Sequence, residues 1–214
     1  MNITEKQKCE LLTLLENDKI FGIEYANSIQ FKKQKFLSNK LPLNLELLSE
    51  YASKCSLCSL SKSKVSFNFD FGDKMSNIMM VSVDKINVRE FDNLKNLFNS
   101  ELEIDINHIY MTNILKCTSK IKKVNFDNEI FQCLSYLEQQ IRIMKPKIII
   151  TIGFAFNYLM NRNDDIRNIS GTLYEYDICK VVPLLGLDFL NKNPSYKVNM
   201  INDLKKIKKL LDEK

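Results

Sequence analysis

The sequence has no apolar run long enough to cross a membrane. Its most apolar stretch, residues 148–156, is far shorter than the roughly 20 residues that a transmembrane helix needs. The opening residues, MNITEKQKCELL, have no apolar segment of signal-peptide length behind a basic start. Internal repeats and low-complexity tracts are absent as well. We therefore expect an ordinary globular protein that is cytoplasmic and makes no membrane contact.

Histidine is also scarce, since His108 is the only one. It opens a strand-like run, which favours a surface or strand-edge residue over a catalytic one. Basic residues exceed acidic ones modestly, with a formal net charge of +5. Such an excess inclines a protein toward polyanions without establishing a nucleic-acid partner.

Cysteine, by contrast, is plentiful, because the chain has six. In a cytoplasmic protein this number indicates metal binding or catalysis rather than a disulfide framework. Cys55 and Cys58 have the C-x-x-C spacing that lets two thiolates meet on one ion. Cys117 ends a predicted strand and Cys133 lies in a predicted helix, so rigid elements hold both. We interpret these four residues as ligands of one metal or iron–sulfur site.

Residue chemistry alone leaves the nature of that site open. Four thiolates suit Zn²⁺ as well as an iron–sulfur cluster, although the wide spacing of Cys117 and Cys133 is unlike a zinc ribbon. Four buried cysteines without any metal are the plainer alternative. Cys9 and Cys179 have no partner at ligand spacing and are predicted to be structural.

Apolar runs of buried-strand length alternate with helical patterns along most of the chain. The predicted strands are residues 78–83, 108–115, 147–152 and 180–185, and the predicted helices are residues 43–52, 91–98, a segment carrying Cys133, residues 154–161 and the C-terminal residues. This alternation predicts an α/β fold, a three-layer α/β/α sandwich with a mostly parallel four-stranded central sheet. Ligands of such folds bind beyond the carboxyl ends of the strands.

The N-terminal part has a different character. A helix is predicted over residues 4–16, and residues 28–40 are polar, basic and aperiodic, which is typical of a linker or mobile arm. Leu41 and Pro42 then mark a break between this segment and the next predicted helix. We predict an N-terminal helical and basic appendage, residues 1–40, and a main domain, residues 41–214.

Several motifs follow one another in the main domain. C-x-x-C-x-L precedes an apolar strand, a strand ending T-N-x-x-K-C, a helix bearing E-I-x-x-C, and then P-K-I-I-I-T-I-G and N-P-S-Y-K. The residues concerned are Cys55, Cys58, Leu60, Thr112, Asn113, Lys116, Cys117, Glu129, Ile130, Cys133, residues 146–153 and residues 193–197. This order resembles the iron–sulfur uracil-DNA glycosylase superfamily, in its thermophile-type, family 4 branch, with the present chain as a divergent member.

The resemblance implies a fold, a cofactor and a reaction. It implies a uracil-DNA glycosylase-like domain in which the four cysteines, Cys55, Cys58, Cys117 and Cys133, hold a [4Fe-4S] cluster. The implied partner is single- or double-stranded DNA, and the implied reaction is hydrolysis of the N-glycosidic bond of a flipped uracil in base-excision repair. We expect the protein to be a monomer.

Asn113 matches the family asparagine that reads the edge of uracil. An amide suits this task because it donates and accepts hydrogen bonds at once. The alternative is a strand-end amide that satisfies the local backbone.

Two motifs of the family's chemistry are altered. Val83 stands where the family has a glutamate in a region that positions water, and the loop that carries a base-stacking phenylalanine is shortened. Phe91 could stack instead, although it also fits the apolar face of its helix. Asp84 is the carboxylate at this strand end and is our candidate catalytic residue. Gly186 replaces the histidine of the family's H-P-S element, so we predict weakened activity.

The loop after Cys117 is basic and lacks the family's prolines. The predicted contacts to DNA phosphates are Lys116, Lys120, Lys122 and Lys123, with Lys192 and Lys197 as secondary contacts. An ordinary solvated loop is the alternative.

Three functions remain open at this point. The first is a divergent uracil-DNA glycosylase, and the second is a catalytically inactive [4Fe-4S] nucleic-acid-binding relative. The third is a zinc-stabilised protein with an unrelated interaction role. The pocket after Val83 and around Gly186 should separate the first two, and visible absorption of the purified protein the last two.

Overall fold

The computed structural model describes residues 41–120 and 126–212. The chain divides into two units, Met1–Lys32 and Lys33–Lys214, and all described residues belong to the second. The predicted helix over residues 4–16 and the predicted linker over residues 28–40 lie outside the described residues. The proposed boundary near Leu41 therefore stays a prediction.

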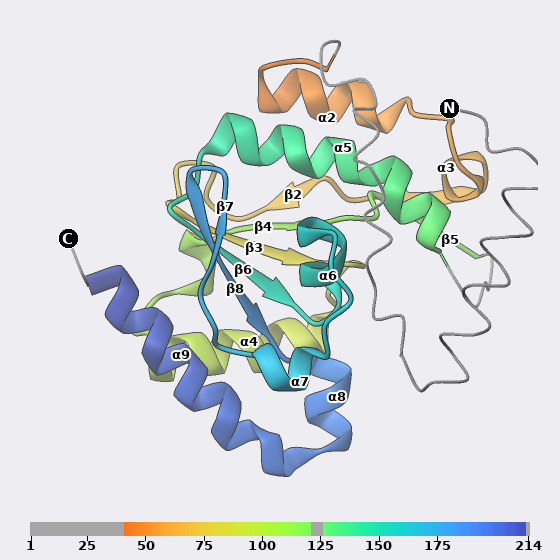
Figure 1. Cartoon of the computed structure of the whole chain (residues 1–214). Helices are drawn as coiled ribbons and strands as arrows, with labels where there is room; N and C mark the ends of the chain where they lie inside the picture. The colour runs from red at the N-terminus through yellow and green to blue at the C-terminus, as the bar shows by residue number, and fades with distance from the viewer. Residues whose placement is uncertain (1–40, 121–125, 213–214) are drawn as a thin grey trace, which may run out of the picture. The chain divides into compact units, whose positions relative to one another are not determined.

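A sheet with the strand order β2-β4-β3-β6-β8-β7 forms the centre of the domain (Figure 1). Its four inner strands are parallel and are β4 (Tyr110–Asn113), β3 (Ile78–Ser82), β6 (Ile148–Ile152) and β8 (Cys179–Leu184). These strands confirm the predicted parallel sheet of an α/β/α sandwich. Two short edge strands, β2 (Asp70–Phe71) and β7 (Tyr174–Tyr176), add antiparallel pairs that the prediction lacked.

Helices cover both faces of this sheet. Alternate residues of a strand therefore pack in the core on one face or in the core on the other. Met79 and Val81 of β3 pack in the core with α5 (Asp127–Met144) and α6 (Ala155–Met160). Met80 packs in the other core, with α4 (Val88–Glu101) and α9 (Lys197–Asp212). A strand that is buried on both faces needs an apolar run without alternation, which is what the sequence has at this position.

The remaining helices are short or peripheral. They are α2 (Leu45–Ser53), which lies along α5, then α3 (Ser59–Lys62), α7 (Ile166–Ile169), α8 (Leu187–Lys192) and two 3-10 turns, Ile106–His108 and Pro194–Tyr196. Across residues 41–120 and 126–212, none of the helices has both the length and the apolar character of a membrane span.

The segment around Cys117 differs from the predicted strand over residues 108–115. His108 ends a 3-10 turn, and β4 begins only at Tyr110. The chain leaves the sheet after Asn113, and Cys117 starts a separate strand, β5 (Cys117–Ser119), paired with β1 (Lys64–Phe67). The prediction that Cys117 ends the sheet strand is therefore wrong. β5 pairs with β1, which follows the C-x-x-C segment, instead of continuing the central sheet.

Candidate functional site

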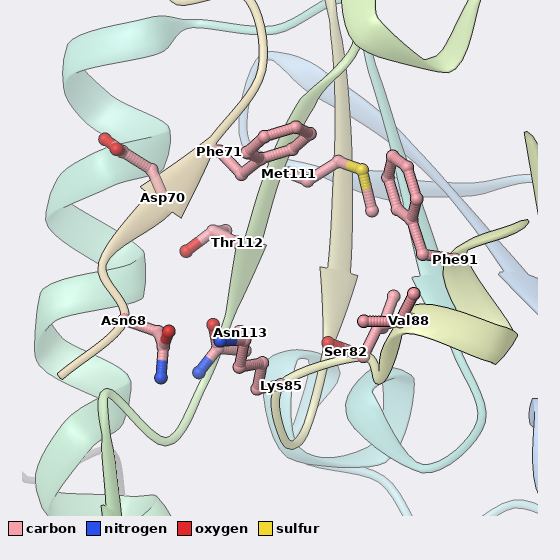
Figure 2. A pocket seen from close by; sticks show the side chains of 11 residues that line it. Asn68, Asp70, Phe71, Ser82, Lys85, Val88, Phe91, Met111, Thr112 and Asn113 are labelled. Atoms are coloured by element: carbon pink, nitrogen blue, oxygen red, sulfur yellow. The ribbon is translucent and has the colours of Figure 1, made fainter. Parts of the chain in front are cut away.

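A pocket of about 320 Å³ opens at the carboxyl ends of β3 and β4, beside the edge strand β2. Its lining residues are Asn68, Asp70, Phe71, Ser82, Lys85, Ile86, Val88, Phe91, Met111, Thr112 and Asn113 (Figure 2). The position agrees with the rule that parallel sheets bind ligands beyond their carboxyl ends. Residues far apart in sequence therefore meet here because β2, β3 and β4 are neighbours in the sheet.

One side of the pocket is aromatic and apolar. The rings of Phe71 and Phe91 meet edge to face, with centroids 5.6 Å apart and planes at 88°. Met111 of β4 lines the same part of the pocket (Figure 2). Phe91 also packs against the core under α4, so it both lines the pocket and fits the apolar face of its helix, and base stacking by Phe91 stays a prediction.

The other end of the pocket is polar. Asn113 ends β4, is buried, and donates from its Nδ2 to the carbonyl oxygen of Leu115. Ser82 ends β3 and donates from its Oγ to the carbonyl oxygen of Asp84 at 2.6 Å. Asn68 points toward Asn113 in Figure 2, and its buried Nδ2 has no hydrogen-bond partner among the described residues. An unpaired buried amide is costly, so this donor is available for a ligand.

Lys116 lies beneath this polar end and is only 1% exposed. Its Nζ donates to Asn113 O at 2.6 Å, Thr112 Oγ1 at 2.7 Å and Gln140 Oε1 at 2.6 Å. Burial lowers the pKa of Lys116 to about 7, against the opposing influence of the neighbouring Cys133 and Asp70 side chains. An ammonium group enclosed in this way cannot reach a phosphate in solvent. The structure therefore removes Lys116 from the predicted phosphate contacts.

The four predicted metal ligands gather in one region next to the pocket. Burial raises the pKa of Cys117, and the nearby Cys58 and Cys55 raise it further against the opposing charge of Lys64. Burial likewise raises the pKa of Cys133 to about 11, with Cys58 and Cys117 adding to the shift and the Lys116 backbone N–H opposing it. The cysteine side chains thus lie close enough for ionisation of one to disfavour ionisation of another, although they come from the α2–α3 segment, β5 and α5.

This donor set suits a soft metal, but the cysteines are not yet arranged as a cage. Across residues 41–120 and 126–212, no group of at least three His, Cys, Asp or Glu side chains is placed to hold a metal ion. Because the pKa values of Cys117 and Cys133 are raised, both are thiols at neutral pH without a metal. Metal binding would therefore release protons and draw the sulfur atoms together.

Other predicted residues lie apart from the pocket or only near it. Val83 packs against the α5 side of the sheet, and Asp84 is exposed, with a pKa raised by partial desolvation. Neither residue lines the pocket. Gly186 follows β8 and packs against Gly153, where a Cβ would lie 3.3 Å from the Cα of Gly186. The family's two altered positions are thus separated across the sheet.

The basic residues fall into two groups. Lys120 is exposed at the end of β5, whereas Lys122 and Lys123 lie outside the described residues. Lys192 and Lys197 are exposed on α8 and at the start of α9.

Sequence reasoning missed several residues of the pocket and of its support, among them Phe71, Asn68, Lys85 and Gln140. Phe71 and Asn68 were overlooked because β2 is too short to give a strand pattern. Lys85, at the pocket mouth, looked like an ordinary loop lysine. Gln140 gave one usable signal, because it is a polar residue on the buried face of α5, where it is fully enclosed.

Comparison with known proteins indicates the family to which the chain is similar. The Uracil DNA glycosylase superfamily model matches residues 69–205, which include every pocket residue except Asn68. The Type-4 uracil-DNA glycosylase of Saccharolobus solfataricus is 25% identical over 190 residues, covering 80% of this chain and 88% of that protein. The corresponding protein of Archaeoglobus fulgidus is 24% identical over 178 residues, covering 75% and 89%.

A third relative is a much longer protein. A DNA polymerase of Bacillus phage SP01 is 28% identical over 106 residues, which are 50% of this chain but only 12% of the polymerase. The family match covers most of the described domain, and the parallel sheet, the strand-end asparagine and the neighbouring cysteines fit it. The chain is therefore a divergent member of the uracil-DNA glycosylase superfamily.

Proposed function

We propose that this protein binds a base flipped out of DNA in the β2–β3–β4 pocket and hydrolyses its N-glycosidic bond weakly, as a divergent uracil-DNA glycosylase. The observation that carries the proposal is the pocket itself. It combines a strand-end asparagine, Asn113, with an aromatic pair, Phe71 and Phe91, at one carboxyl edge. The names of the Type-4 relatives support uracil in DNA as the substrate.

The pocket has the groups that a flipped base requires. An aromatic ring can stack on the face of a base, and an amide can pair with its donor and acceptor edge. Phe71 and Phe91 supply the rings, whereas Asn113 and the unpaired Nδ2 of Asn68 supply amide groups. Lys85 at the mouth carries a positive charge suited to the adjacent phosphate.

We also propose that Cys55, Cys58, Cys117 and Cys133 hold a [4Fe-4S] cluster. The support is the soft character of four thiols and their closeness, because ionisation of one disfavours ionisation of its neighbours. The cluster would supply a structural cross-link between the C-x-x-C segment, β5 and α5, directly behind the polar end of the pocket. The basic residues Lys120, Lys122 and Lys123 follow one of the ligands and would meet the DNA backbone.

Hydrolysis is expected to be weak because two groups are lacking. Val83 cannot hold a water by hydrogen bonds, and Gly186 has no side chain to stabilise the departing base. Loss of one well-placed donor of this kind lowers a rate by about 10²–10³. Asp84 could orient water only after moving toward the pocket, since it does not line it.

The test uses protein purified without oxygen and oligonucleotides that carry one deoxyuridine, in single- and double-stranded form. We expect selective binding of the deoxyuridine strand over a matched thymidine strand, with slow release of free uracil. Equal affinity for both strands would contradict a base-reading pocket, and fast turnover would contradict the predicted weakness.

The second candidate is a non-catalytic nucleic-acid-binding relative with the same cluster. The sequence match to part of a DNA polymerase favours it, because it associates a similar segment with a protein whose named activity is DNA synthesis. This candidate predicts selective binding with no uracil release at any enzyme concentration. A colourless preparation that contains zinc would instead favour the zinc-stabilised alternative.

A further inference from the structure

One wall of the base pocket depends on a very short strand. β2 has two residues and pairs only with β4, through Asp70 opposite Thr112 and Phe71 opposite Met111. So short a ladder has few backbone hydrogen bonds, yet Phe71 belongs to the aromatic wall. Interactions beyond the ladder must therefore hold this wall in register.

Side chains supply those interactions. The carbonyl oxygen of Phe69, just before β2, accepts from Thr112 Oγ1 at 2.8 Å and from Gln140 Nε2 at 3.2 Å. Asp70 Oδ2 accepts from the Tyr110 hydroxyl at 3.0 Å. Gln140 belongs to α5, and Tyr110 packs in the core shared with α5, so these three hydrogen bonds tie β2 to that side of the sheet.

Lys116 joins these contacts into one network. Gln140 donates to Tyr110 at 2.8 Å while its Oε1 accepts from Lys116 Nζ at 2.6 Å. The same Nζ also donates to Thr112 Oγ1 and to Asn113 O. The charged form of Lys116 has three N–H donors, which these three short contacts can engage, and Phe69 O lies further away, at 3.4 Å.

The backbone of Lys116 adds two further links. Its carbonyl oxygen accepts from the Asn68 N–H at 2.8 Å, and its N–H interacts with the thiol of Cys133. Lys116 is therefore hydrogen-bonded to the backbones of both pocket asparagines, Asn68 and Asn113, and it also contacts one proposed cluster ligand.

We propose that Lys116 is a positioning residue of the base pocket, which holds the β2 wall and Asn113 at a fixed separation. The identity of the ligand as a base rests on the proposed function above. A buried cation is expensive, and an apolar side chain of the same length would pack more cheaply in a core. A structural lysine would not need partners on both sides of a pocket, whereas a positioning lysine does.

The experiment compares wild type with Lys116→Met, which removes the ammonium donors but keeps much of the aliphatic stem. Lys180→Met is the matched control, because Lys180 is an exposed lysine on β8, away from the pocket. The first measurement is hydrogen–deuterium exchange of a peptide that covers residues 66–73. The second is the ratio of affinities for a deoxyuridine and a thymidine oligonucleotide, and the third is the salt dependence of binding.

We expect Lys116→Met to accelerate exchange in residues 68–72 and to lower the affinity ratio by roughly tenfold, with the salt dependence unchanged. The control should match wild type in all three measurements. Unchanged exchange and an unchanged ratio overturn the proposal. Exchange that accelerates equally in β3 and β6 also overturns it, because that result describes a general core residue.

A second variant and an independent measurement keep the test decisive. If Lys116→Met does not fold, Tyr110→Phe removes the hydroxyl that donates to Asp70 and accepts from Gln140, and it should produce the same changes at smaller size. If wild type itself shows no preference for deoxyuridine, the proposed function fails, and the exchange measurement still decides the role of Lys116.

Discussion

At the scale of single residues, Asn113 carries the clearest functional assignment. It stands at the end of β4, where β3 and β2 bring Ser82 and Asn68 close to it. We predict that Asn113→Ala abolishes the preference for deoxyuridine over thymidine while leaving general DNA affinity within about twofold, because phosphate contacts supply most nonspecific binding. Competition binding with matched oligonucleotides measures both. A variant that keeps the preference would show that another residue reads the base.

Asp84 gives a pH-dependent prediction. Partial desolvation by neighbouring atoms raises the pKa of the Asp84 carboxyl group although the residue is exposed, so the folded protein holds this proton more tightly than the unfolded chain does. Asp84 therefore opposes folding above its raised pKa, and this cost fades as the pH falls through that value to about 4. Asp84→Asn should raise the thermal midpoint slightly at pH 7 and not at pH 4. An equal gain at both pH values would assign the effect to packing rather than charge.

At the scale of secondary-structure elements, β5 and α5 bring the distant cysteines to the C-x-x-C segment. We predict that Cys117→Ser loses iron and visible absorption and lowers the thermal midpoint, because serine is a poor ligand for a soft metal. Cys179→Ser is the control, since this buried cysteine belongs to β8. Iron content and visible absorption of the purified variants provide the measurement. Full iron retention in Cys117→Ser would remove this residue from the proposed ligand set.

The sequence predicted the elements that depend on continuous apolar runs. β3, β6 and β8 were found because burial on both faces leaves no ambiguity in their composition. The edge strands β2 and β7 were missed because two or three partly exposed residues give no periodicity. The aromatic wall of the pocket escaped notice for the same reason, since Phe71 belongs to β2.

Lys116 illustrates a different limit of sequence reasoning. A lysine in a basic stretch suggests a solvated phosphate contact, and only its acceptors explain its burial. Those acceptors include Gln140 on α5, which is distant in sequence and comes close only in the folded sheet. Asn113, in contrast, was predictable, because the carboxyl end of a parallel strand is a fixed place in this fold.

At the scale of the whole molecule, the excess of positive charge predicts how DNA binding responds to salt. Replacing Lys120, Lys122 and Lys123 by glutamine should reduce the slope of log K against log salt by about 0.9 for each phosphate of duplex DNA that is no longer neutralised. A triple replacement of Lys205, Lys206 and Lys209 on α9 removes the same charge from another surface. Equal effects of the two variants would mean that net charge, rather than the loop after Cys117, governs binding.

The last prediction concerns the whole carboxyl edge of the sheet, since a glycosylase must close on the base from several strands at once. We propose that Asn113 acts from β4, and we align the missing histidine of the family with Gly186, beyond β8. Gly186 has φ −66° and ψ 142°, which any residue adopts, and a Cβ there would lie 3.6 Å from the Cα of Gly153, an ordinary contact.

Gly186→His should therefore fold and raise the rate of uracil release, by at most about 10²-fold, because one recovered donor stabilises the departing base. Single-turnover assays measure that rate, with Gly186→Leu as the control for bulk without a donor. A stable Gly186→His protein with the wild-type rate would show that this position does not limit the chemistry, and would leave the water-positioning side at Val83 as the missing part.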